Sequence, residues 1–151
     1  MSCLFKNIDN MISEHISYAE SIHSDAAIRA GLNNYFTQKQ LATMKVTAEK
    51  IYEPLISHFG VPIYVSSFFR TKELNILIGG SSSSQHCLGE AIDMDASFYG
   101  RITNKQIFDY IKYNLEFDQL IWEKGTDIEP GWVHCSYRTR KPNRKQILRN
   151  V

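Results

Sequence analysis

The sequence lacks the features that mark several classes of protein. No stretch comes near the roughly 18 consecutive apolar residues of a membrane-spanning helix, and no apolar stretch follows Lys6 near the N-terminus, so we expect neither a membrane span nor a secretory signal. Cysteine is scarce, and the three cysteines, Cys3, Cys87 and Cys135, form no CxxC pair. Because an odd number of scattered cysteines does not make a disulfide framework, we expect free thiols.

The chain also has no large excess of charge of one sign. Its 17 basic and 16 acidic residues give a formal net charge of +1, so composition does not indicate a nucleic acid partner. The segment 138–145, with Arg149 beyond it, is the basic exception. It is either a solvated end of the domain or a patch that attracts an anionic polymer such as a bacterial cell wall. The length of 151 residues predicts one domain over 1–151, and we expect a monomer.

The hydrophobic pattern predicts helices first and then short strands with one crossing helix. Apolar residues recur at helical spacing over 37–59, with Pro54 as the expected kink. A second helix is expected over 103–115. Strands are expected over 62–67, 91–96, 120–123 and 132–137, with a hairpin loop over 123–131. This order predicts an α+β fold with a small, mainly antiparallel sheet and flanking helices.

Three residues have the chemistry and the placement of metal ligands. His86 and Asp93 lie seven residues apart, and Gly89 between them allows a sharp turn, so both side chains can point at one site. His134, on a predicted strand, offers a third ligand. Imidazole and carboxylate are good zinc ligands, and three protein ligands leave a position open for water, as in catalytic zinc sites. Spacing alone is weak evidence, because a histidine between apolar residues is more often part of the core.

Three segments strengthen this interpretation, because in order they resemble the zinc D-alanyl-D-alanine carboxypeptidase family. That family includes phage endolysins that cut L-alanyl-D-glutamate bonds and VanX-type dipeptidases. The first segment is SSFFRTKELN at 66–75. The second runs from the GG at 79–80 through SQH at 84–86 to Asp93. The third combines DQLI at 118–121 with WVHCS at 132–136. The resemblance covers about residues 36–137 and implies a hedgehog/D-Ala-D-Ala-peptidase-like fold.

The resemblance also implies roles for individual residues. It implies that His86, Asp93 and His134 bind Zn²⁺, and that Arg70 steadies the substrate or the charged intermediate. A guanidinium suits that task because it is always charged and presents a planar fork to an oxyanion; the alternative for Arg70 is a salt bridge to Glu73. Ser84 and Gln85 are expected to orient His86 or to bind substrate.

The general base is where the sequence departs from the family pattern. Many relatives have an acidic residue three positions before the last histidine ligand, and here that position is Gly131. A carboxylate is still needed to take a proton from water and pass it to the leaving amine. Glu123 is the first candidate, because a hairpin would bring it beside the strand of His134. Glu129 is second and Asp127 third, and both can equally be ordinary solvated loop residues.

The resemblance implies a zinc metallopeptidase, either a carboxypeptidase or an endopeptidase, that hydrolyses a D-amino-acid-containing bond of peptidoglycan. Without a signal peptide, we expect it to be made in the cytoplasm and to act on the cell wall after lysis-type release or as a virion component, as phage endolysins do. Two alternatives stay open. One is a non-catalytic zinc-binding module that binds the cell wall; the other is a hydrolase with Cys87 or Cys135 as nucleophile.

Overall fold

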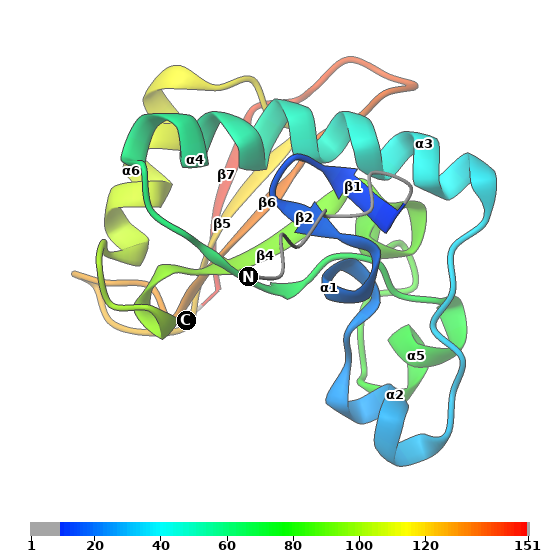
Figure 1. The fold of residues 1–151 in the computed structure, drawn as a ribbon. Coiled ribbons are helices and arrows are strands. Elements are labelled where there is room, and N and C mark those ends of the chain that lie inside the picture. Colours follow the sequence, from blue (N-terminus) through cyan, green and yellow to red (C-terminus); the bar gives the residue numbers. More distant parts are fainter. Residues whose placement is uncertain (1–9, 151) are drawn as a thin grey trace, which may run out of the picture.

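A computed structural model describes residues 10–150 of the chain (Figure 1). The predictions made for Cys3 and for the first nine residues lie outside this part. In the N-terminal half the elements are β1 (Met11–Ser13), β2 (Ile16–Ser17), α1 (Tyr18–Ile22), α2 (Asp25–Ala30), α3 (Gln38–Thr47), the π-helical turn η2 (Ala48–Tyr52), α4 (Glu53–Phe59) and β3 (Tyr64–Ser67). Then follow α5 (Lys72–Leu77), the 3₁₀ turn η3 (Gln85–Leu88), β4 (Ala91–Asp95), the 3₁₀ turn η4 (Ala96–Phe98), α6 (Asn104–Asn114), β5 (Gln119–Glu123), β6 (Trp132–Ser136) and β7 (Gln146–Asn150).

The fold is α+β, as predicted, but its main sheet is mixed rather than mainly antiparallel. The five strands lie in the order β3-β4-β6-β5-β7. Strands β3, β4, β6 and β5 pair antiparallel with their neighbours, and β7 then joins β5 in parallel, with Ile121 opposite Leu148. Strands β1 and β2 form a separate two-stranded antiparallel sheet. The difference comes from β7, which follows the basic segment 138–145 and was not predicted as a strand.

The long helical region over 37–59 forms largely as predicted. Thr37 and Gln40 make a capping box at its start, and Gly60 ends it in the left-handed conformation with φ of 66°. The helix is interrupted by η2, which ends two residues before Pro54. Proline has no N–H and its ring crowds the carbonyl one turn earlier, so a wider π turn accommodates it. Figure 1 shows this helical stretch crossing in front of the sheet.

The two faces of the main sheet have different roles. One face packs on the helices, and its strand residues belong to the same buried cluster as Met44, Ile51 and Leu55 of the long helical region. The strand residues in that cluster include Ile92, Met94, Leu120, Trp122, Val133 and Cys135. Because successive strand residues alternate between faces, Asp93 and His134 point to the opposite face. No helix within residues 10–150 is both long and apolar enough to span a membrane.

Candidate metal centre

The register of β4 and β6 brings two of the predicted ligands together. Asp93 and His134 are directly paired across the two antiparallel strands, and their side chains therefore leave the sheet on the same face. His134 Nδ1 lies 2.8 Å from Asp93 Oδ1. Their backbone neighbours Met94 and Cys135 are fully buried on the helix side, so the alternation predicted for Cys135 is confirmed.

His86 reaches the same point from the turn η3. Gly89 ends that turn with φ of 76°, a left-handed conformation that suits glycine, and the chain then enters β4. His86 is 2% exposed. Its Nδ1 donates a hydrogen bond to the carbonyl oxygen of Phe68 at 2.7 Å. Its Nε2 lies 3.3 Å from Asp93 Oδ1 but makes no hydrogen bond there or elsewhere among the described residues.

Burial and the contacts within the cluster together set its protonation states. Burial lowers the pKa of His86, and the nearby Asp93 carboxylate opposes this only in part. Burial alone would raise the pKa of Asp93, but the imidazoles of His86 and His134 beside it hold that pKa well below the usual range. The cluster therefore offers a neutral imidazole on His86 and an ionised carboxylate, which are the forms that bind a metal ion.

The donor set and its geometry fit a zinc ion. One ligand atom from each of His86, Asp93 and His134 can be chosen so that all lie within 4.8 Å of one another. Two imidazoles and one carboxylate are a common zinc set, and the bond to Phe68 fixes the His86 tautomer so that the lone pair of Nε2 faces the cluster. A buried nitrogen with no hydrogen bond is costly unless a ligand satisfies it.

A second group of possible ligands, Glu14, His15 and Glu53, lies elsewhere. Glu14 and His15 are exposed, and Glu53 already accepts hydrogen bonds from Ser13 Oγ and from the backbone and ring nitrogens of His15. These residues line a cavity of about 970 Å³ that contains none of the predicted site residues. Nothing in this group therefore indicates a metal as the His86 cluster does.

Arg70 lies against the cluster rather than against Glu73. Its Nη2 is 3.3 Å from Asp93 Oδ2, and its Nε donates to Ser67 Oγ at 3.1 Å. Nη1 donates to Asn75 Oδ1 at 3.4 Å. These contacts hold the guanidinium beside the metal ligands, with 16% of the side chain exposed. The alternative of a surface salt bridge to Glu73 is not what the structure contains.

The three candidate bases lie in different surroundings. Glu123 pairs with Trp132 at the end of the β5–β6 ladder and lines the same cleft as the metal cluster. Its Oε2 accepts a hydrogen bond from Asn150 Nδ2 at 2.8 Å. Glu129 instead accepts from the backbone N–H of Lys105 at the start of α6, and Asp127 pairs with Arg149. Of the three, Glu123 alone lines the cleft.

The cleft around the cluster has a volume of about 950 Å³. Its floor is the open face of β5 and β6, including Ile121 and Trp132, and the loop 78–84 forms one side. Ser84 and Gln85, predicted to bind substrate or orient His86, both line it. Ser84 Oγ accepts from the backbone N–H of His86 at 3.3 Å. Gln85 turns away from His86 and places its Nε2 between two buried carboxylates, Glu90 and Asp118.

Sequence reasoning missed these two carboxylates and their partners. Glu90 and Asp118 are 1% and 0% exposed, and they accept from Arg140 and Arg144 of the basic segment. The sequence predicts a solvated end or a patch for an anionic polymer in this basic segment, and neither interpretation includes pairing with buried acids. Its arginines line the cleft as well. The sequence shows the two acids and the basic run, but it does not show that the acids are buried or which arginine each of them binds.

The two cysteines in the described part are free. Burial raises the pKa of the Cys87 thiol despite the nearby charges of Arg70 and Lys72, and burial also raises that of Cys135. A thiol nucleophile needs a lowered pKa, so both environments argue against the cysteine hydrolase.

The comparisons with known proteins agree with the motifs. No curated protein matched the chain. Residues 14–136 match the family described as Peptidase M15, and this span includes His86, Asp93, His134, Arg70 and Glu123. Since the match covers most of the chain, the protein belongs to the M15 peptidases, the metallopeptidase family of the zinc D-alanyl-D-alanine carboxypeptidases.

Proposed function

We propose that this protein is a zinc-dependent peptidase that hydrolyses a D-amino-acid-containing peptide bond of bacterial peptidoglycan. The observation that carries the proposal is the His86 Nε2 atom, which is buried, without a hydrogen bond, and aimed at Asp93 beside His134. Family membership supports the same conclusion. How the substrate fills the cleft decides whether the cleaved bond lies inside the peptide or at its end. We also propose that the protein reaches the cell wall as a phage-type lytic enzyme.

The residues that line the cleft beside the metal cluster have separate tasks in this reaction. A zinc ion held by His86, Asp93 and His134 would supply Lewis-acid polarisation of the scissile carbonyl and of the attacking water. Arg70 lies against Asp93, where its guanidinium can donate to the oxygen that becomes negative during attack. The Arg70 contacts to Ser67 and Asn75 hold it in place before substrate arrives.

Glu123 is proposed as the general base. Its carboxylate takes the proton of the attacking water and returns it to the leaving amine. Asn150 Nδ2 holds Oε2, which leaves Oε1 free for the proton. This arrangement replaces the acidic residue that many relatives have at the position of Gly131, because the end of β5 runs beside the strand of His134.

Peptide release from purified peptidoglycan tests the proposal. We would follow turbidity and soluble peptides with the protein as prepared, with a chelator, with zinc restored, and with His86→Ala. His23→Ala is the matched control, because His23 is exposed and outside the cluster. We expect release that is lost with chelator, regained with zinc, absent in His86→Ala and unchanged in His23→Ala. Stoichiometric zinc binding without release would instead support the non-catalytic wall-binding module.

A further inference from the structure

Three arginines form one side of the cleft next to the metal cluster. Arg138, Arg140 and Arg144 lie in the segment between β6 and β7, and all three line the same cavity as His86, Asp93 and His134. We call these residues the arginine wall. The cavity therefore carries positive charge beyond Arg70, on the side reached from the C-terminal segment.

Two buried carboxylates, Glu90 and Asp118, bind the arginine wall on the side away from the cleft. Arg144 binds Asp118 through two parallel hydrogen bonds, Nε to Oδ1 at 3.0 Å and Nη2 to Oδ2 at 2.8 Å. Arg140 Nε donates to Glu90 Oε1 at 3.1 Å. Gln85 Nε2 joins the two acids, since it lies 3.1 Å from both Glu90 Oε2 and Asp118 Oδ2. Glu90 and Asp118 are almost completely inaccessible, so on this side the cleft is lined by guanidinium groups rather than by the carboxylates that bind them.

Arg138 is the member that shares its acid, because it lies beside the same Asp118 carboxylate that Arg144 binds. Its Nε lies 3.2 Å from Asp118 Oδ2 but makes no hydrogen bond, and that oxygen already accepts from Arg144 and Gln85. Among the described residues, the Arg138 side chain donates no hydrogen bond at all. Of its three nitrogens only Nε is buried, so Nη1 and Nη2, which carry four of its five donors, stay accessible from the cleft although only 20% of the side chain is exposed. Three arginines share two acids, so the group has one net positive charge, and Arg138 is the arginine whose donors are not used by either acid.

We propose that Arg138 binds a carboxylate of the peptide substrate, and that the arginine wall makes the cleft selective for acidic peptides. This inference rests on the proposed function for the peptide nature of the ligand. A guanidinium fork matches a carboxylate with two parallel hydrogen bonds, and a partly buried site strengthens the pairing. Arg140 and Arg144, each tied to a buried acid, keep the wall rigid and add to the positive potential that attracts the substrate.

A matched pair of peptides tests the inference without any mutation. One is a synthetic wall stem peptide with its carboxylates free, and the other is the same peptide with each carboxylate converted to the primary amide. We expect the zinc-loaded wild-type protein to cleave the free acid with a kcat/KM roughly tenfold to a hundredfold higher, the factor that a charge-assisted hydrogen bond contributes. Equal kcat/KM values would overturn the inference and leave the proposed function standing.

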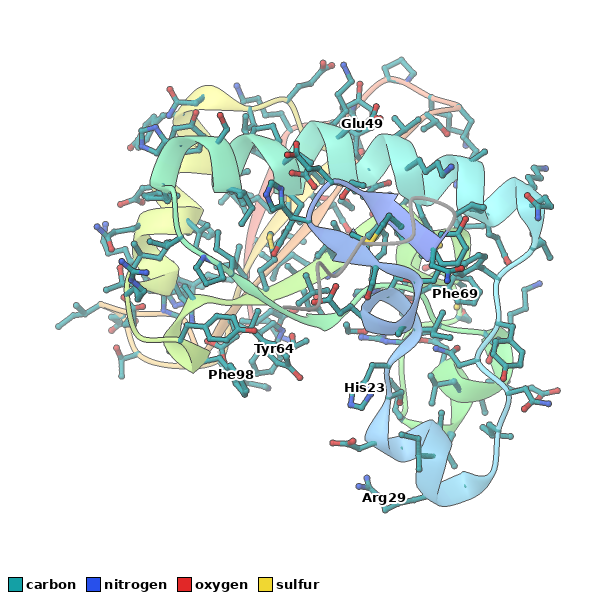
Figure 2. All side chains as sticks on the ribbon, in the orientation of Figure 1. His23, Arg29, Glu49, Tyr64, Phe69 and Phe98 are labelled. Carbon is teal, nitrogen blue, oxygen red and sulfur yellow. The ribbon has the colours of Figure 1, made fainter. Side chains whose placement is uncertain are left out.

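Variants then assign the selectivity to Arg138. In Arg138→Gln the ratio of the two kcat/KM values should fall close to one, and Arg138→Lys, which keeps the charge but loses the fork, should give an intermediate ratio. Arg29 lies on α2 and is labelled at the lower edge of Figure 2. Arg29→Gln removes the same charge there and should keep the wild-type ratio. A full preference retained in Arg138→Gln would exclude Arg138 as the carboxylate site.

Binding separates this inference from the proposed function. If the wild-type protein cleaves neither peptide, the proposed function fails, and calorimetric titration of the same two peptides still decides the inference. Tighter binding of the free acid that is lost in Arg138→Gln would support the carboxylate site in a non-catalytic protein. Equal affinity for the two peptides would overturn it.

Discussion

His86 Nδ1 donates to the carbonyl oxygen of Phe68 at 2.7 Å, and this one contact determines which nitrogen of His86 faces Asp93. A backbone carbonyl only accepts hydrogen bonds, so Nδ1 carries the proton and Nε2 presents its lone pair. The backbone of Phe68, directly after β3, thus orients the His86 ring so that Nε2 faces the cluster. No hydrogen bond from another side chain is needed.

Zinc should stabilise the wild-type fold through this cluster. A ligand that binds only the folded state at 100 times its Kd adds about 2.7 kcal/mol to the free energy of unfolding. We therefore expect the Tm of metal-free protein to rise by several degrees on addition of zinc, and the rise to vanish in His86→Ala. Differential scanning fluorimetry with and without chelator measures this. An equal rise in His86→Ala would place the stabilising zinc elsewhere in the chain.

Glu123→Gln should remove catalysis and keep the metal. The amide is nearly the same size and can still face Asn150, but it cannot take a proton, so kcat should fall about 100-fold or more. Zinc content, measured by mass spectrometry of metals, should stay at the wild-type level. Glu129→Gln and Asp127→Asn are matched controls, since these residues contact Lys105 and Arg149 instead. Loss of activity in Glu129→Gln alone would reverse the assignment.

Gly89→Ala should weaken both the fold and the site. A Cβ at Gly89 would lie 2.5 Å from Met44 Cγ, in addition to the left-handed φ of 76°. Gly31→Ala is the control that separates backbone strain from the clash with Met44, because Gly31 has a similar φ of 66° but open space around its Cβ position. We expect Gly31→Ala to lose about 1–2 kcal/mol and Gly89→Ala to lose clearly more in urea unfolding, together with zinc affinity. Equal losses would mean that Met44 moves aside freely.

The sequence predicted the elements of the site better than their surroundings. His86, Asp93 and His134 meet because Gly89 turns the chain and because β4 and β6 alternate in the expected way. Both features leave local signals, namely a glycine at the turn and alternating apolar residues in the strands. The roles of these residues in binding metal and in catalysis remain predictions.

The C-terminal segment could not be predicted in the same way. Strand β7 is exposed on all five residues, so it has no alternation of buried and exposed side chains, and its place in the sheet depends on backbone pairing with β5. The arginine wall depends in turn on Glu90 and Asp118, which are 28 residues apart in the sequence. The tertiary fold determines which arginine binds which acid, and the number of charged residues in the sequence does not indicate these pairs.

Asp118 should make the stability of the fold depend on pH. Burial would raise the pKa of Asp118, but hydrogen bonds from Arg144 and the charges of Arg144 and Arg138 outweigh this and lower it. Because the folded pKa lies below the unfolded value of about 3.9, the ionised carboxylate stabilises the fold above that pH. The contribution is lost as the pH falls from there through the folded pKa.

Asp118→Asn should therefore be less stable at pH 7, by about 1–3 kcal/mol, the cost of leaving buried hydrogen-bonding groups without their partner. Its stability should also fall less steeply than that of the wild type below pH 4, since one proton uptake is removed. Asp127→Asn is the matched control: its ion pair with Arg149 is made by a carboxylate side chain that is 91% exposed, and such pairs contribute at most about 1 kcal/mol. Urea unfolding at pH 7 and at several values down to pH 3 gives both quantities. If Asp118→Asn and Asp127→Asn lost equally little, the buried carboxylate would not be what holds the arginine wall, and the C-terminal segment would depend on β7 pairing alone.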